Sequence, residues 1–318
     1  MSNKQKKTET GFRTSIGGQA LIEGILMRGP QKQAIAIRRP DGGIEVKEEE
    51  LTLIKDKHPI LGWPFIRGVV TFLDSMVKGV KALTYSAEFL PEDEQEQPSK
   101  LDLWIEKKFG SEAAEKFVIG VAVFLGICLS VGLFILLPTI IAGAFSGIIA
   151  SYFVRNLVEG LIRIVIFLAY LWLCTQMKDV KRLFAYHGAE HKTIFCYEHM
   201  KELTVENVRP ESRFHPRCGT SFLFVVIIIS ILVFAVVRWS NVWVRMILRI
   251  ALLPVVVGIS YEINRWVGRH DNALSSALSW PGKQLQRLTT NEPDDSMIEC
   301  AIEALKRVIP EEKGADRW

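Results

Sequence analysis

The residues best suited to chemistry lie in the stretch YHGAEHKTIFCYEH, residues 186–199. His187 and His191 are four residues apart, so on a helix they share one face, and Glu190 lies beside them. The spacing H-x-x-E-H is that of inverted zinc-hydrolase motifs, in which the histidines bind zinc and the glutamate activates water. We therefore interpret His187 and His191 as metal ligands and Glu190 as a general base.

Three interpretations of this cluster are open. A third ligand from His215, Cys218 or Glu262 leaves one coordination position open and makes a catalytic site for metal-assisted hydrolysis. A closed tetrahedral site, in which His215 and Cys218 join both histidines, only holds the chain together. Imidazole and thiolate ligands favour zinc as the divalent metal. The third interpretation is a hydrogen-bonded polar cluster without a metal.

The elements around these residues are apolar. The chain has 318 residues, of which 49% are hydrophobic and 23% charged, so the apolar residues must be concentrated in a few segments. Four stretches approach the length of about 20 residues that crosses a bilayer. They cover residues 117–137, 157–177, 221–237 and 244–262. We expect an α-helical polytopic membrane protein with about four transmembrane helices; two buried hairpins in a soluble protein are the alternative.

Charged residues occur inside two of these stretches. Glu159 and Arg163 are spaced to form an i,i+4 pair, and Arg245 and Arg249 lie close enough to a helix end to snorkel to the membrane surface. Basic residues also indicate the orientation. Loop 178–220 carries eight lysines and arginines, whereas the other connections carry about one each, which places this loop and both termini in the cytoplasm.

The sequence lacks the features of secreted, disulfide-rich and nucleic-acid-binding proteins. The start, MSNKQKKTETGFRTS, is polar and has no apolar core behind it, so we expect no cleavable signal peptide. Five scattered cysteines argue against a disulfide framework. The net charge of +4 is explained by basic loops on an anionic membrane leaflet, and no nucleic-acid-binding module is recognisable.

The N-terminal part is expected to lie in the cytoplasm. After a flexible segment, residues 1–15, we expect a small β-rich domain over residues 16–58, because apolar residues alternate on both sides of Pro40-Asp41-Gly42-Gly43. The glycines of IGGQALIEGILMRGP indicate a sharp turn or a close approach of the backbone to something else. Residues 59–90 have helical periodicity and predict an amphipathic helix, which we expect to pack on the transmembrane bundle rather than lie in the membrane interface.

The remaining segments complete the expected organisation. Residues 91–100 read as an acidic linker, and residues 101–262 as the transmembrane region. Residues 263–318 predict a cytoplasmic helical tail, broken at Trp280-Pro281-Gly282 and again at Asn291-Glu292-Pro293.

Five blocks of the sequence resemble the YqhQ-like family of bacterial membrane proteins. The blocks are GGQALIEGILMRGP, YHGAEHKTIFCYE, HPRCGTSF, YEINRW and EPDDSMIECAIEAL, and the resemblance extends over nearly the whole chain. The family is catalogued as a domain of unknown function and labelled a predicted metal-dependent enzyme. The resemblance implies a multi-pass protein of the bacterial inner membrane, and it implies shared positions at Glu23, Met27, Arg28, His187, Glu190, His191, His215, Cys218, Glu262 and Arg265.

Two functions remain open from the sequence. One is a metal-dependent hydrolase at the cytoplasmic membrane surface, acting on a lipid-linked, peptide or membrane-protein substrate. The other is a non-enzymatic membrane partner or regulator, which binds another membrane protein and uses the His/Cys cluster only to stabilise its fold. Beyond the lipid bilayer, the sequence identifies no specific partner.

The orientation can be tested by cysteine labelling from outside the cell. Because loop 178–220 is predicted to be cytoplasmic, cysteines introduced there should stay unlabelled by a membrane-impermeant reagent, whereas cysteines near Ser146 or Asn241 should react. Strong external labelling of the loop would reverse the predicted topology.

Overall fold

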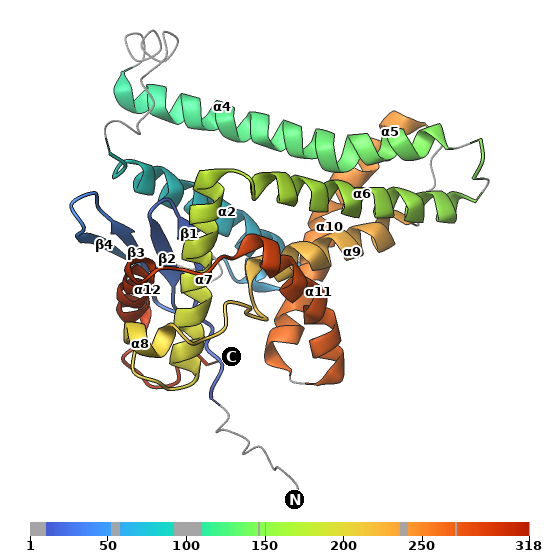
Figure 1. Cartoon of the computed structure of the whole chain (residues 1–318). Helices are drawn as coiled ribbons and strands as arrows, with labels where there is room; N and C mark the ends of the chain where they lie inside the picture. Colours follow the sequence, from blue (N-terminus) through green and yellow to red (C-terminus); the bar gives the residue numbers. More distant parts are fainter. Residues whose placement is uncertain are drawn as a thin grey trace, which may run out of the picture. The chain divides into compact units, whose positions relative to one another are not determined.

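The structure, a computed structural model, describes residues 11–51, 58–91, 110–145, 147–149, 151–235, 241–270 and 272–317 (Figure 1). These residues belong to two compact units. The first contains Met1–Leu90, Leu171–Ile229 and Pro254–Trp318, and the second contains Pro91–Tyr170 and Ser230–Leu253. Nearly all of the expected acidic linker, and the first ten residues of the expected flexible N-terminus, lie outside the described residues.

The first unit contains a four-stranded antiparallel sheet with strand order β1-β2-β3-β4. The expected hairpin is confirmed: β3 and β4 pair from Lys32↔Glu50 to Arg38↔Ile44. Gly42, in the turn between them, has a φ of +86°, a left-handed conformation that glycine adopts without steric cost. The strands are β1 (Gly17–Leu21), β2 (Gly24–Arg28), β3 (Lys32–Arg38) and β4 (Ile44–Glu50).

The two faces of this sheet pack on different helices, because successive strand residues point to opposite sides. Ile25 and Met27 face a core shared with α7 (Lys178–Glu198) and α12 (Asp295–Val308). Leu26 faces a second core that includes residues of α2 (Ile66–Ala87). Figure 1 shows α7 and α12 next to the sheet. The sheet therefore separates α2 from the helix that carries the candidate site.

The C-terminal tail differs from its predicted pattern. Helix α11 (Ala273–Thr289) runs without interruption through Pro281, so the break predicted at residues 280–282 is wrong. The helix starts at a capping box formed by Asn272 and Ser275, and a Cβ on Gly282 would lie 2.4 Å from Ser221 Oγ. A firm cap and close packing thus compensate for the hydrogen bond that proline cannot donate. The second predicted break is present, since Thr290 is extended and α12 begins at Asp295.

The other helices of the chain are short or apolar. Those around loop 178–220 are α8 (Val205–Val208) and α9 (Gly219–Ala235), and α10 spans Val242–Arg269. The second unit contains α4 (Ser111–Val131), a π-helical turn η2 (Gly132–Leu136), α5 (Leu137–Ala144) and most of α6 (Tyr152–Cys174). A 3-10 turn, η1 (Pro59–Gly62), precedes α2.

The charges inside the second unit pair with one another. The predicted Glu159–Arg163 pair is present at 3.4 Å, and Arg249 donates to both carboxylate oxygens of Glu159. Arg163 Nε also donates to the carbonyl of Phe134, in the π-helical turn, at 2.8 Å. Arg249 is only 1% exposed, so it is buried among these partners and does not snorkel. Buried charges require such partners, because an unpaired charge in an apolar medium is costly.

Three helical stretches are long and apolar enough to cross a membrane: Phe117–Ala144, Phe153–Cys174 and Trp243–Arg269. They correspond to three of the four predicted transmembrane stretches. The stretch predicted at 221–237 overlaps the shorter apolar helix α9, Gly219–Ala235, and residues 236–240 lie outside the described part of the chain. The structure is therefore consistent with a membrane protein, and the orientation of its helices stays a prediction.

Two adjacent glycines of β1 offer a matched test of the packing between the sheet and α7. A Cβ on Gly18 would lie 2.7 Å from the carbonyl oxygen of Leu26 and 3.0 Å from the Glu190 side chain, whereas a Cβ on Gly17 would meet no described atom within 4 Å. We expect Gly18→Ala to lower the free energy of unfolding by about 1–3 kcal/mol, because the backbone of β2 cannot move aside freely. Gly17→Ala should leave thermal unfolding in detergent unchanged. Equal unfolding midpoints for the two variants would contradict this packing.

Candidate metal centre

The candidate site is built on the buried middle of α7. Residues 188–194 of this helix are all buried, and His187 retains 13% of its side-chain exposure. Cys218, directly before α9, completes the group: one possible ligand atom from each of His187, His191 and Cys218 lies within 4.8 Å of the others. His187 Nε2 is 3.1 Å from Cys218 Sγ, and the two histidine rings are 4.4 Å apart between centroids.

Both histidines are oriented by backbone carbonyls. His187 Nδ1 lies 2.8 Å from the carbonyl oxygen of Thr289, and His191 Nδ1 lies 2.6 Å from that of Arg213. A carbonyl oxygen can only accept a hydrogen bond, so each Nδ1 carries the hydrogen. In the neutral imidazole, the Nε2 atom then keeps a free lone pair. This arrangement is typical of metal-binding histidines, whose other nitrogen donates to a carbonyl or carboxylate.

The Nε2 atom of His191 is the least satisfied atom of the group. His191 is 1% exposed, and its Nε2 has no hydrogen-bond partner among the residues that the structure describes. A buried polar atom without a partner costs free energy of about 1–3 kcal/mol. One possible ligand atom of His191 lies within 4.8 Å of one each from Cys218 and His187, so a cation bound by Nε2 in this group would remove this cost.

Cys218 has the electrostatics of a thiolate. Burial alone would raise the pKa of Cys218, but His187 and His191 beside it lower the pKa well below its ordinary value. Burial alone would likewise lower the pKa of His187, and the contact with Cys218 raises it to about 9. Thr220 supplies two further weak donors, its backbone N at 3.5 Å and its Oγ1 at 3.3 Å from Sγ. A thiolate is the form of cysteine that binds metals.

The ends of two helices also favour a negative charge on Cys218 and a positive charge on His187. Cys218 precedes the first residue of α9, and Thr289 is the last residue of α11. The N-terminus of a helix carries partial positive charge and favours an anion, whereas the C-terminus carries partial negative charge and favours a cation. A thiolate at Cys218 would therefore lie at the end of α9 that stabilises it, and His187 binds a carbonyl that would lack a partner within α11.

Glu190 lies beside the three candidate ligands without belonging to their group. Its Oε1 accepts a hydrogen bond from the backbone N of Gly18 at 3.0 Å, and its Oε2 lies 4.0 Å from His187 Nε2. Its side chain is 7% exposed, and burial raises the pKa of the carboxyl group. Gly18 itself is exposed, so solvent reaches the strand next to this carboxylate.

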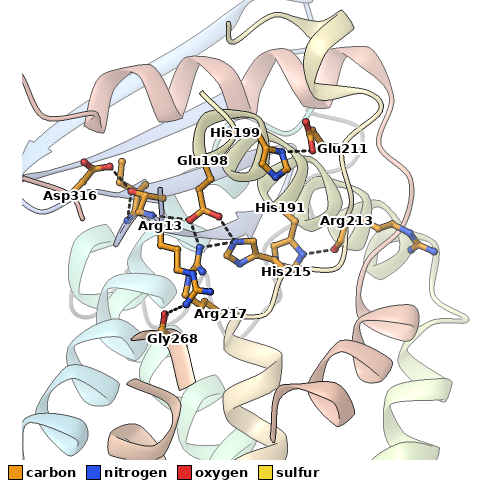
Figure 2. Close-up of polar contacts among 12 residues, drawn as sticks. Arg13, His191, Glu198, His199, Glu211, Arg213, His215, Arg217, Gly268 and Asp316 are labelled. Carbon is orange, nitrogen blue, oxygen red and sulfur yellow. Dashed lines mark hydrogen bonds and ion pairs between the residues drawn. The ribbon is translucent and has the colours of Figure 1, made fainter. Parts of the chain in front are cut away.

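His215 is close to the site but has other partners. Its Nε2 lies 3.5 Å from Glu198 Oε2, and its ring centroid is 5.6 Å from that of His191. Figure 2 shows Glu198 in contact with both His215 and Arg217. Burial lowers the pKa of His215 to about 4, so the ring is neutral at pH 7. The structure thus brings His187, His191 and Cys218 together and directs His215 to a neighbouring carboxylate.

Glu262 lies apart from the histidines. Its carboxylate accepts hydrogen bonds from Arg67 of α2, at 2.7 Å from Nε and 2.5 Å from Nη2. Glu262 therefore connects α10 to α2, and the third candidate ligand in the structure is Cys218.

The positions singled out near the N-terminus also lie outside the ligand group. Met27 is fully buried in the core between the sheet and α7. Arg28 donates to Asp74 and Ser75. Glu23 has a φ of +51° and accepts hydrogen bonds from Arg182 and Tyr186 of α7.

Some contributions to the site had no clear signal in the sequence. The carbonyls of Thr289 and Arg213 are backbone groups, which any residue type provides. The glycine pair at residues 17–18 did carry a signal, because the expected close approach of backbone is the contact between Gly18 and Glu190. Glu198 also binds the N-terminal segment, since the backbone N of Thr14 donates to it at 2.9 Å. Thr14 Oγ1 in turn donates to Asp316.

Comparison with known proteins identifies the family of this chain. A family described as "Protein of unknown function (DUF1385)" matches residues 63–311. The uncharacterized protein YqhQ of Bacillus subtilis (strain 168) is 35% identical over 300 residues, which cover 93% of this chain and 92% of that protein. No solved structure shows significant similarity. The chain therefore belongs to the DUF1385 family, to which the resemblance in its sequence blocks pointed.

Proposed function

We propose that His187, His191 and Cys218 bind one zinc ion. The observation that carries this proposal is the buried Nε2 of His191, whose lone pair has no partner among the described residues. Zinc–ligand bonds of about 2.0–2.3 Å in a tetrahedron separate donor atoms by roughly 3.3–3.6 Å. The 3.1 Å between His187 Nε2 and Cys218 Sγ is close to this spacing. Two imidazoles and a thiolate suit zinc better than magnesium or calcium.

The ligand set supports a catalytic site more than a closed structural one. Three protein ligands leave a fourth position of a tetrahedral ion for water or substrate, whereas structural zinc sites use four protein ligands. His215, the candidate for the fourth ligand of a closed site, interacts with Glu198 instead. The exposed strand at Gly18 provides an approach for solvent next to Glu190.

In this proposal, Glu190 is the general base of a metal-dependent hydrolase. Bound zinc supplies Lewis-acid activation of water. Glu190 would serve as the proton acceptor, because the hydrogen bond from Gly18 to Oε1 orients the carboxylate and leaves Oε2 free to accept a proton. A position at the cytoplasmic surface of the bacterial inner membrane would suit a lipid-linked, peptide or membrane-protein substrate.

One observation favours the structural alternative. The candidate ligands come from α7 and from the start of α9. The carbonyls that orient the histidines come from residue 213 and from the end of α11, so a bound metal would connect four segments of the chain. In that case the protein is a non-enzymatic partner or regulator of another membrane protein, and the metal only stabilises the surface that binds it. Glu190 would then do no more than orient His187.

The first test is the metal content of the purified protein. We expect about one zinc per chain in protein prepared without chelators, and we expect its loss in His191→Ala, because two ligands hold zinc poorly. His199→Ala is the matched control: His199 directly follows α7, is 45% exposed and pairs with Glu211. Elemental analysis of the folded proteins provides the measurement. No metal in the wild-type protein, or equal metal in both variants, would leave only a polar cluster.

The second test separates catalysis from stabilisation through Glu190→Gln. The amide has the size of the carboxylate but cannot take a proton, so a catalytic site should keep its zinc and its thermal stability and lose all function. The measurements are zinc content and complementation of a deletion strain. Full complementation would exclude Glu190 as an essential base. A loss of zinc that parallels the loss of function would support the structural alternative, since replacing a group that orients a ligand weakens metal binding by roughly 10- to 100-fold.

A further inference from the structure

Helix α2 presents its large apolar side chains outward. Leu73 is 56% exposed, Met76 49% and Val77 57%, and these three residues share one side of the helix. The 3-10 turn and the start of α2 continue the apolar surface with Ile60, Trp63, Phe65 and Ile66, each at least 40% exposed. We call these seven residues the outer face of α2.

The side of α2 that packs on protein carries the small residues. Its buried positions are Gly68, Gly79, Ala82 and Ser86. A Cβ on Gly79 would lie 2.5 Å from Oε1 of Gln19 in β1, so the helix and the sheet approach too closely for a side chain. A helix on a water-soluble domain has the opposite arrangement, with its large apolar residues in the core. Small residues toward protein and large ones outward are typical of helices in contact with lipid.

The start of α2 is fixed to the C-terminal half of α10. A Cβ on Gly68 would lie 2.6 Å from Tyr261 Cβ, and one on Gly258 would lie 2.8 Å from the carbonyl oxygen of Phe65. Both contacts belong to the stretch Trp243–Arg269, which is apolar and long enough to cross a membrane. They lie where its apolar sequence gives way to Glu262, whose carboxylate binds Arg67. The outer face therefore begins at the level where this stretch would leave the hydrocarbon region.

The charged side chains along one flank of the outer face are mainly basic. Lys78 and Lys81 lie on this flank, Arg67 on the same flank binds Glu262, and Asp74 is neutralised by Arg28 and Lys78 at 3.0 and 2.9 Å. Basic residues beside an apolar face favour the anionic headgroups of a membrane surface.

We propose that η1 and α2 lie in the plane of the membrane interface, with the outer face of α2 in the acyl chains. The occupant of this face is lipid, not water and not another protein. The sequence favoured packing on a transmembrane bundle, and in the structure the start of α2 contacts α10; the large apolar side chains of the outer face are nevertheless left exposed. The proposal requires that the chain is inserted in a membrane, and it does not depend on whether the candidate site binds zinc.

Spin labels on α2 test the proposal in the full chain reconstituted in vesicles of phosphatidylethanolamine and phosphatidylglycerol. Cys128 and Cys174 would be replaced by serine, because the other three cysteines are buried. One label would be placed at Val77 on the outer face and the matched label at Thr71, which is exposed on the polar flank of the same helix, beside Lys78. Collision rates with oxygen, which concentrates in lipid, and with a water-soluble nickel chelate report the surroundings of each label.

We expect the ratio of oxygen to nickel collisions to be several-fold higher at Val77 than at Thr71. Equal ratios at the two positions would show that the outer face lies in water and would overturn the proposal. Protection of Val77 from both reagents, with a strongly immobilised spectrum, would show that protein covers this face and would overturn it as well. A label at Leu73 repeats the measurement on the same face, so the result does not depend on one variant.

Discussion

The hydrogen bonds that bind His187 and His191 to backbone carbonyls determine what the cluster can do. Each bond places the hydrogen on Nδ1 and leaves the lone pair of Nε2 free, and one possible ligand atom from each of the two histidines and Cys218 lies within 4.8 Å of the others before any ligand arrives. The carbonyls lie far from α7 in the sequence, one before α9 and one at the end of α11. The helices of the first unit must therefore pack correctly for the site to exist. This dependence explains why Gly188 faces the carbonyl of Asn291, which would lie 2.1 Å from an added Cβ.

The sequence predicted the part of the site that one helix determines. His187, Glu190 and His191 lie within five residues, and helical geometry fixes which of them are neighbours. The third ligand could not be chosen in this way, because His215, Cys218 and Glu262 lie on other segments. The choice depends on competing partners: Glu198 interacts with His215, and Arg67 binds Glu262. Such competition depends on tertiary contacts that the spacing of residues does not report.

The same distinction applies to the fold. The β3–β4 hairpin was predictable because its signals, alternating apolar residues and a glycine turn, are local. Helix α11 was predicted to break because Pro281 is a local signal too, but a capping box and close contact with Ser221 outweigh it. Arg249 was assigned to the membrane surface from its place in the sequence. Its partner Glu159 lies on another helix, and only the packed unit reveals the pair.

Successive residues of strand β1 point to opposite faces of the sheet, so this strand contacts both the candidate site and α2. The backbone N of Gly18 holds Glu190 on one face of the sheet, and the side chain of Gln19 rests on Gly79 of α2 on the other. One peptide bond joins these two contacts, so α2 cannot shift against the sheet without moving the amide that orients the carboxylate. With α2 in the bilayer as proposed, a change in lateral pressure or in bilayer thickness that shifts α2 would also change the position of Glu190. Strand β1 would then transmit changes in the membrane to the geometry of the candidate site.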